Sequence, residues 1–234
     1  ARLLGSRPGV ARPCGCVGTA AQQSARGAVA LRLSPTGPVT CLGLTVLILI
    51  LVPISGAHFH PAVSLVDWVL GRRRGTGLTL PGLGTYAIAQ TVGAVGGSAL
   101  ANAMFEVGTS ISMKDRATTG HLLGEVVATA GLVLLIFALA ATNRGALAAP
   151  AVGAYIGAAY WFTSSTSFAN PAVTVGRIFS DTFAGIAPGS VPGFVVAQLL
   201  GAAVGLGLLL FLFPSAANYA DDVVLPRSSE KASS

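Results

Sequence analysis

Two short stretches of this chain combine polar side chains with a shared Pro-Ala-Val core. The first, "SGAHFHPAVSLVD" (residues 55–67), carries His58 and His60. The second, "STSFANPAVTVGR" (residues 165–177), carries Asn170 in the position that matches His60. In both stretches a polar residue precedes a proline, and proline is favoured at the first position of a helix that a polar side chain caps. Each stretch is therefore predicted to be a loop that opens a short helix.

The chemistry open to these residues is limited. His58 and His60 form a His-x-His pair, which is a metal-binding pattern, but Asp67 is the only further ligand nearby. The hydroxyl residues of 163–167 have no base or orienting acid in register with them, so they do not form a nucleophilic site. The sequence predicts no enzyme, no metal site and no cofactor.

The composition places the chain in a membrane. Of its 234 residues, 53% are hydrophobic and only 9% are charged, whereas soluble domains have about 25% charged residues. The net charge is +6, but the basic residues form short clusters between apolar runs, which favours a topology signal over a nucleic-acid site. We expect a multi-pass protein of the cell (inner) membrane with the lipid bilayer as its surroundings. The expected spanning helices are Val39–Ile54, Leu80–Met104, Leu122–Ala141, Ala146–Phe162 and Val191–Phe213.

The two short helices, expected over Pro61–Leu70 and Pro171–Phe179, are too short to cross a bilayer. An odd number of spans separates them, so they enter from opposite faces, as in an inverted repeat with broken helices. Irregular backbone at membrane depth is tolerated where it lines a cavity or is buried in protein. Two opposed helix N-termini disfavour cations, while polar caps offer hydrogen bonds to neutral solutes. This arrangement indicates a pore for small uncharged molecules. The basic cluster at Arg72–Arg74 is expected on the cytoplasmic side.

The motifs "SGAHFHPAV" and "FANPAVTVGR" resemble the two Asn-Pro-Ala loops of the aquaporin and glycerol-facilitator family. The resemblance extends from about Val39 to Phe213. "YWFTSSTSFANPAV" and "SDTFAGIAP" are similar to the bacterial branch associated with arsenical-resistance gene clusters. The resemblance implies an all-α membrane channel, a homotetramer with one pore per subunit, and passive flux of water, polyols or arsenous acid.

The resemblance also assigns the pore motifs. The second motif, Asn170, Pro171 and Ala172, matches the family fully. The first motif is His60, Pro61 and Ala62, where the family has an asparagine first. Both His60 and Asn170 are expected to meet the solute at the centre of the pore, with His58 as a pore-lining residue on the cytoplasmic side.

In typical water channels of the family, an aromatic residue, a histidine, a small residue and an arginine form the outer constriction. The matching positions here are Thr40, Ala158, Ser167 and Val173. Since none of these is bulky or charged, the resemblance implies a wide and weakly polar constriction. Arg177 lies one helical turn beyond Val173, and two roles stay open: it replaces the missing charge, or it sits in the outer vestibule, which we favour.

Glu125 lies inside an expected span, where an ionisable group is a functional candidate by default. The resemblance implies that it accepts hydrogen bonds from the loop of the second motif. The alternative is a glutamate that extends toward the headgroups from near a helix end.

The ends of the chain are expected to lie outside the channel domain, which we place at residues 38–213. Residues 1–37 are rich in arginine and contain no spanning run, so the first span of the family is expected to be missing or degraded there. Residues 214–234 form a polar tail. Because only five spans are expected where the family has six, the alternative function is a non-conducting remnant or truncated gene product.

Overall fold

The computed structural model describes residues 29–72 and 77–214, and these residues are helical apart from their connections. The expected leader up to residue 28, Arg73–Arg74 and the tail from residue 215 lie outside the described residues. The α-helices are α2 (Val29–Ser55), α3 (Pro61–Gly71), α4 (Leu80–Met104), α5 (Thr119–Ala141), α6 (Ala148–Phe162), α7 (Pro171–Gly176) and α8 (Val191–Leu212). Three short 3₁₀ turns cover Gly145–Leu147, Arg177–Phe179 and Pro188–Ser190.

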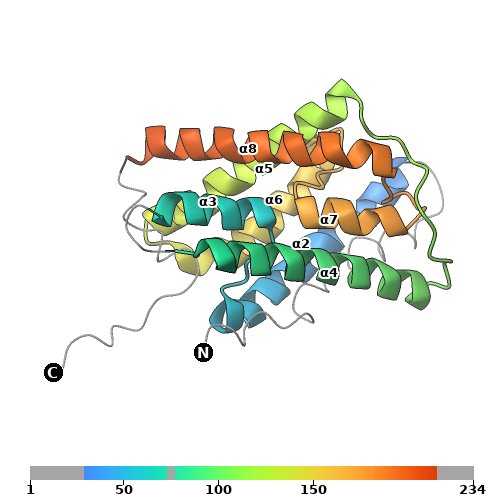
Figure 1. Ribbon diagram of the computed structural model, residues 1–234, viewed down its shortest axis with the longest axis horizontal. Helices are drawn as coiled ribbons and strands as arrows, with labels where there is room; N and C mark the ends of the chain where they lie inside the picture. The colour runs from blue at the N-terminus through green and yellow to red at the C-terminus, as the bar shows by residue number, and fades with distance from the viewer. Residues whose placement is uncertain (1–28, 73–76, 215–234) are drawn as a thin grey trace.

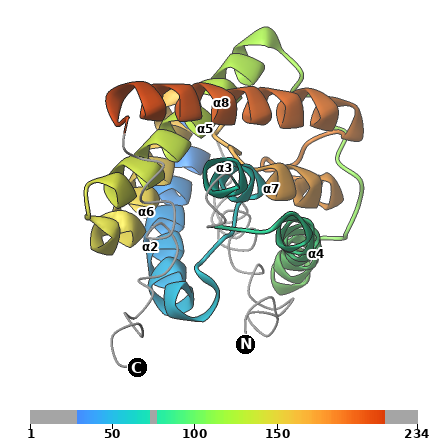
Figure 2. The ribbon, with the colours of Figure 1, turned by 60° about the vertical axis from the view of Figure 1, so that its left-hand side comes forward.

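The two short helices lie at the centre of the bundle. Figure 1 shows α3 and α7 placed end to end, with α8 on one side of them and α4 on the other. In Figure 2, α2, α5 and α6 stand together on the opposite side of this pair from α4. The tightest helix pairs are α5 with α8 and α2 with α6. The long helices thus enclose two half-helices whose N-terminal ends meet inside the protein.

Most element boundaries agree with the expectation from sequence. The bounds of α4 are the expected ones, and the bounds of α5, α6 and α8 differ from the expected bounds by a few residues. The start of α2 was predicted wrongly, because the helix begins at Val29 and not at Val39. It continues through two prolines, Pro35 and Pro38, which membrane helices tolerate where neighbouring groups satisfy the freed backbone. The short helix at the second motif also ends early, and Arg177–Phe179 form a 3₁₀ turn.

Four segments of the described chain are long and apolar enough to cross a membrane by length and composition. Helix α4 is as long, with 25 residues, but glycine and polar side chains make it less apolar. The four segments are Thr36–Ser55, Thr119–Ala141, Gly145–Phe162 and Pro188–Leu212.

Glycine residues set the spacing of the α5–α8 pair. A Cβ atom added at Gly201 of α8 would lie 2.5 Å from the carbonyl oxygen of Val126 in α5. One added at Gly205, a turn further on, would lie 2.5 Å from the carbonyl oxygen of Ala130. Small residues that let two backbones approach are a common way to associate helices in lipid, where no hydrophobic force drives them together. The two glycines therefore determine how closely α8 packs on α5.

We predict that Gly201→Val weakens the packing of α8 on α5. The valine side chain would clash with the α5 backbone, and overpacking of this kind costs about 1–3 kcal/mol. Thermal unfolding in detergent micelles, followed by circular dichroism, should show a lower melting temperature than for the wild type. Gly207→Val is the matched control, since a Cβ at that position of the same helix meets no atom within 4 Å. Equal melting temperatures for the two variants would contradict the prediction.

Candidate functional site

The two motif loops are joined by a reciprocal pair of hydrogen bonds. The Nε2 atom of His60 contacts the carbonyl oxygen of Ala169, which precedes Asn170. The Nδ2 atom of Asn170 donates to the carbonyl oxygen of Phe59, which precedes His60, over 2.9 Å. Each capping residue therefore bonds to the backbone just before the other. This pair holds the N-terminal ends of α3 and α7 against each other.

Both residues also cap their own helices. The Nδ1 atom of His60 accepts from the backbone N–H of Ala62 at 3.2 Å. It follows that the proton of a neutral His60 is on Nε2, which donates to Ala169. The Oδ1 atom of Asn170 accepts from the N–H groups of Ala172 and Val173, at 2.9 and 3.3 Å. The sequence analysis expected His60 to meet the solute at the centre of the pore. The residue lines the cavity, but both of its ring nitrogens have protein partners, so the side chain also braces the two loops.

The loops themselves have a matching backbone path. Ala57 and Ser167, each three residues before its cap, both have a positive φ, of 49° and 44°. The preceding residues, Gly56 and Thr166, also have a positive φ, of 70° and 61°. Left-handed backbone at non-glycine residues costs of order 1–3 kcal/mol each, so the surrounding structure must enforce it. The repeated conformation supports the expected inverted repeat at the level of the backbone.

Two glutamines on the flanking helices stabilise the half-helices in equivalent ways. Gln90 of α4 donates to the carbonyl oxygen of His58 and, at 3.4 Å, to the hydroxyl of Ser64. Gln198 of α8 donates to the hydroxyl of Thr174 at 2.9 Å. Ser64 and Thr174 both lie four residues after their capping residue. The sequence analysis did not select either glutamine, although both occur in a Gln-x-x-Gly pattern that repeats in α4 and α8.

Glu125 holds the second loop from within α5. It has no exposed surface, and its two carboxylate oxygens accept from the backbone N–H groups of Phe168 and Ala169 at 2.8 and 2.7 Å. Gln198 donates to the same carboxylate at 2.5 Å. The contacts are those that the family resemblance implies for this position. The alternative placement near the headgroups does not occur, because the side chain points into the bundle.

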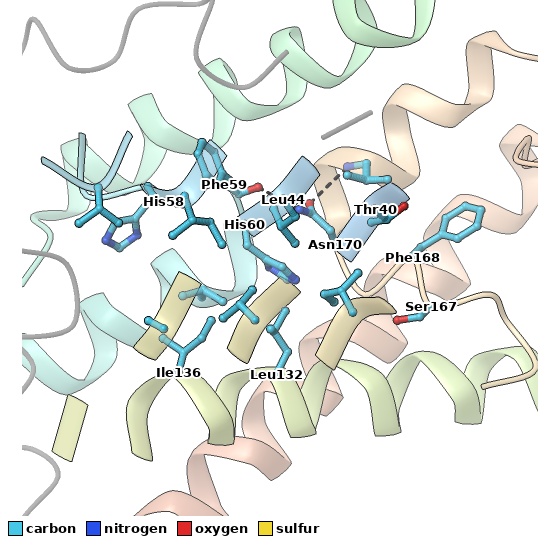
Figure 3. A pocket seen from close by; sticks show the side chains of 18 of the residues that line it. Thr40, Leu44, His58, Phe59, His60, Leu132, Ile136, Ser167, Phe168 and Asn170 are labelled. Atoms are coloured by element: carbon cyan, nitrogen blue, oxygen red, sulfur yellow. Dashed lines mark hydrogen bonds between the residues drawn. The ribbon is translucent and has the colours of Figure 1, made fainter. Parts of the chain in front are cut away.

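A cavity of about 130 Å³ runs along the joined loops. Aliphatic side chains from α2, α5 and α6 form one wall, and the two motif loops form the other. Figure 3 shows His58 at one end, which we call the His58 end, and Thr40, Ser167 and Phe168 at the other, which we call the filter end. The aliphatic wall consists of Leu44, Ile48, Val52, Leu132, Ile136, Val152 and Ile156.

The filter end contains three of the four residues expected for the constriction. Thr40, Ser167 and Val173 line the cavity, whereas Ala158 is exposed on the outside of α6 and does not line it. Tyr160, two positions further along α6, lines the cavity instead. Two residues along an α-helix correspond to a rotation of about 200°, so a small error in counting moves a residue to the opposite face. The placement of Ala158 was therefore wrong.

Arg177 reaches back into the cavity. The sequence analysis favoured a place in the outer vestibule, but the side chain is 3% exposed and lines the filter end. Its guanidinium carbon lies 4.1 Å from the centre of the Phe168 ring, and its Nη2 atom donates to the Tyr160 hydroxyl at 3.1 Å. This stacking on Phe168 directs the Arg177 side chain toward the cavity. Sequence spacing could not reveal it, because it depends on Phe168 from the preceding loop.

Arg116 anchors the connection between α4 and α5, and the sequence analysis gave it no role in the site. Its guanidinium donates to the carbonyl oxygens of Gly185, Phe183 and Ser165. Its guanidinium carbon lies 5.0 Å from the centre of the Phe168 ring. Burial, and secondarily the positive charge of Arg177, lower the pKa of Arg116 to about 10, so it stays charged at neutral pH.

His58 lines the cavity, and its expected place on the cytoplasmic side stays a prediction. Its Nδ1 atom bonds to the Ser64 hydroxyl at 3.0 Å, and its Nε2 atom has no partner among the described residues. The ring packs against Tyr86 of α4, with 5.3 Å between ring centres. His58 and His60 therefore differ, because among the described residues one ring nitrogen of His58 has no hydrogen-bond partner.

We predict that Glu125→Ala loosens the second motif loop. The change leaves the N–H groups of Phe168 and Ala169 without acceptors, at about 1–3 kcal/mol for each buried group. Hydrogen exchange read by mass spectrometry should show faster exchange in the peptide that contains these two residues. Glu106→Ala removes an exposed glutamate and serves as the control. Unchanged exchange in the Glu125 variant would show that its carboxylate does not hold the loop.

Comparisons with known proteins agree with this architecture. The family model described as "Major intrinsic protein" matches residues 13–167. The chain is 51% identical over 174 residues to the aquaglyceroporin AqpS of Rhizobium meliloti (strain 1021), covering 74% of this chain and 72% of that protein. It is 32% identical over 196 residues to aquaporin NIP1-1 of Zea mays, covering 76% and 66% of the two chains.

A solved structure supports the fold. The aquaglyceroporin from Plasmodium falciparum superposes with a TM-score of 0.60 at 19% identity, covering 96% of this chain and 95% of that one. Together with the matched family model, these similarities identify the chain as a multi-pass membrane channel protein of the major intrinsic protein family.

Proposed function

We propose that this channel passes small neutral solutes, namely water, polyols and arsenous acid, through the cavity between the motif loops and the aliphatic wall. The observation that carries the proposal is the reciprocal bonding of His60 and Asn170, which places two half-helix N-termini beside one continuous cavity. The similarity to an aquaglyceroporin supports solutes larger than water. The mechanism needs no cofactor and no covalent step.

We assign the centre of the pore to Asn170. One N–H of its amide group is bonded to Phe59, and the second remains for a passing solute. Because His60 offers no free N–H, the centre is poorer in donors than a pore with two asparagines. The opposite wall is aliphatic, so it can contact the C–H groups along one side of a polyol. This combination favours solutes that have both an apolar side and hydroxyl groups.

We assign the size limit to the filter end, where Thr40, Ser167 and Val173 line the cavity. Val173 takes the position of the arginine in typical water channels of the family. A valine there leaves more room and removes a charge, which supports a wide filter. Tyr160, which the sequence analysis did not select, and Arg177, for which it kept open the role of replacing the missing charge, also line the cavity. Arg177 lies against Phe168 and returns a positive charge to this end.

Within the described residues, the two halves of the repeat differ, since α5 and α6 precede α7, whereas α2 alone precedes α3. We propose further that the protein is a homotetramer. The apolar outer surface of α2, which includes Leu42 and Ile50, supports assembly into a homotetramer as in the family resemblance.

We predict that Val173→Phe narrows the filter end. Polyol flux into proteoliposomes, measured by stopped-flow light scattering, should fall about tenfold, which corresponds to a barrier higher by about 1.4 kcal/mol. Water flux should fall less, since water is smaller. Val196→Phe is the matched control, because Val196 is exposed on α8. A polyol flux unchanged by Val173→Phe would place the size limit elsewhere.

The His60→Asn variant separates the channel from the alternative of a non-conducting remnant. His60 lies at the centre of the structure, bonded to Ala169, so a non-conducting protein would be blocked at this side chain. We expect the wild type to conduct a polyol above empty liposomes and the variant to conduct at least as well, because asparagine is smaller. Flux in the variant alone would locate a block at His60. Absence of flux in both proteins would refute the channel proposal and leave the remnant.

A further inference from the structure

We propose that the filter end of the cavity is an oxyanion-binding site in which Arg177 is the charged ligand, so that a small monovalent oxyanion such as formate binds there. This inference deepens the proposed function and rests on it for one consequence, the block of neutral-solute flux. The binding site itself follows from the geometry around Arg177.

The guanidinium of Arg177 has donors that no group in the described part of the chain uses. Its Nε and Nη1 atoms have no hydrogen-bond partner among the described residues, although the side chain is only 3% exposed. Buried charges in proteins are normally paired or fully hydrogen-bonded, since an isolated charge is costly to remove from water. Arg177 lines the cavity, so its unused donors are available to a ligand in that space.

Two hydroxyl groups at the same end are also without partners. The Oγ atom of Ser167 and the Oγ1 atom of Thr40 have no hydrogen bond within the described residues, and both residues line the cavity. The two residues are 2% and 5% exposed. A guanidinium and two hydroxyls are donors that suit oxygen atoms bearing negative charge. The three side chains come from the second loop, α2 and the turn after α7, so the fold brings them together from distant segments.

The charge balance at this end favours an anion over a neutral solute. Arg116 and Arg177 both lie against the Phe168 ring, so two positive charges are close together. Glu125 supplies one negative charge, and its two oxygens are taken by Phe168, Ala169 and Gln198. A neutral polyol would satisfy the donors but leave the excess positive charge, whereas a monovalent oxyanion would also compensate the charge. Attraction between charges is stronger in such a buried site than in water.

The arginine is held in place before any ligand binds. Its ring contact with Phe168 and its bond to the Tyr160 hydroxyl fix the guanidinium on one side. Gly176, the residue before it, lies so close to α4 that an added Cβ would be 2.7 Å from the backbone of Ala94. The turn that carries Arg177 is therefore fixed against α4. Preorganisation of this kind lowers the cost of binding.

The direct test measures formate binding to the full purified chain in detergent by titration calorimetry at constant ionic strength, with chloride as the background anion. Formamide, which has a similar shape and no charge, is the second ligand. We expect formate to bind and formamide to bind at least about tenfold more weakly. Equal affinities for the two ligands, or no binding of formate, would overturn the proposal.

Variants locate the site. Arg177→Gln should weaken formate binding at least about tenfold, and Arg177→Lys should restore part of it because the charge remains. Arg144→Gln, the same change at an exposed arginine, is the control and should bind as the wild type does. Circular dichroism establishes that the variants fold. If Arg177→Gln fails to fold, protection of the wild-type peptide containing Ser167 from hydrogen exchange by formate decides, and no protection refutes the site.

A flux measurement separates this proposal from the channel function. Formate should reduce polyol flux through the wild type, and the reduction should be absent in Arg177→Gln. Formate binding without any polyol flux would leave the oxyanion site standing and refute the channel function. Polyol flux in a protein that does not bind formate would refute the oxyanion site and leave the channel function standing.

Discussion

The structure depends on hydrogen-bond partners for the backbone N–H and C=O groups of two irregular loops in the middle of an apolar bundle. Residues 56–60 before α3 and residues 163–170 before α7 lie outside regular helices, and several of them adopt left-handed conformations. No water is at hand in lipid to bond their polar groups, so protein groups must do it. His60 and Asn170 do so across the two loops, while Glu125 and Gln90 do so from the surrounding helices. Gln198 supports them indirectly, because it donates to the Glu125 carboxylate. The long helices can then be almost entirely apolar, because a small set of polar residues serves both loops.

The replacement of an asparagine by His60 shows how such a site adapts. Histidine and asparagine each have one atom that accepts a hydrogen bond from a backbone N–H in the first turn of the helix. Each has another atom that donates a hydrogen bond to a group outside that helix. The imidazole ring is longer, and its Nε2 atom reaches the backbone of the opposite loop. Asn170 makes the corresponding bond to Phe59 with a shorter side chain. The hydrogen bonds between the two loops are therefore kept, while fewer donors face the cavity than in a pore with two asparagines.

The sequence predicts those features that depend on local patterns. The Pro-Ala-Val motifs, the spanning segments and the bounds of α4 follow from composition and from helix-start signals. The contact of Glu125 with the second loop follows from the family resemblance. Features that depend on side chains meeting in space were missed or misplaced. Ala158 was placed on the wrong face because its position relied on counting through the end of α6. For Arg177 the sequence left two roles open and favoured the outer vestibule, because the direction of the side chain depends on stacking with Phe168.

The cavity has one aliphatic side and one side made by the motif loops, except at the filter end, where Thr40 of α2 and Tyr160 of α6 add hydroxyl groups. A solute moving through it keeps its carbon atoms toward Leu44, Ile48 and Leu132, and its hydroxyl groups toward the loops. It cannot turn over without facing hydroxyls to the aliphatic wall, where no partner is available for them. We therefore expect passage to depend on the arrangement of hydroxyl groups around a carbon chain, so that stereoisomers of longer polyols with the same size and composition pass at different rates.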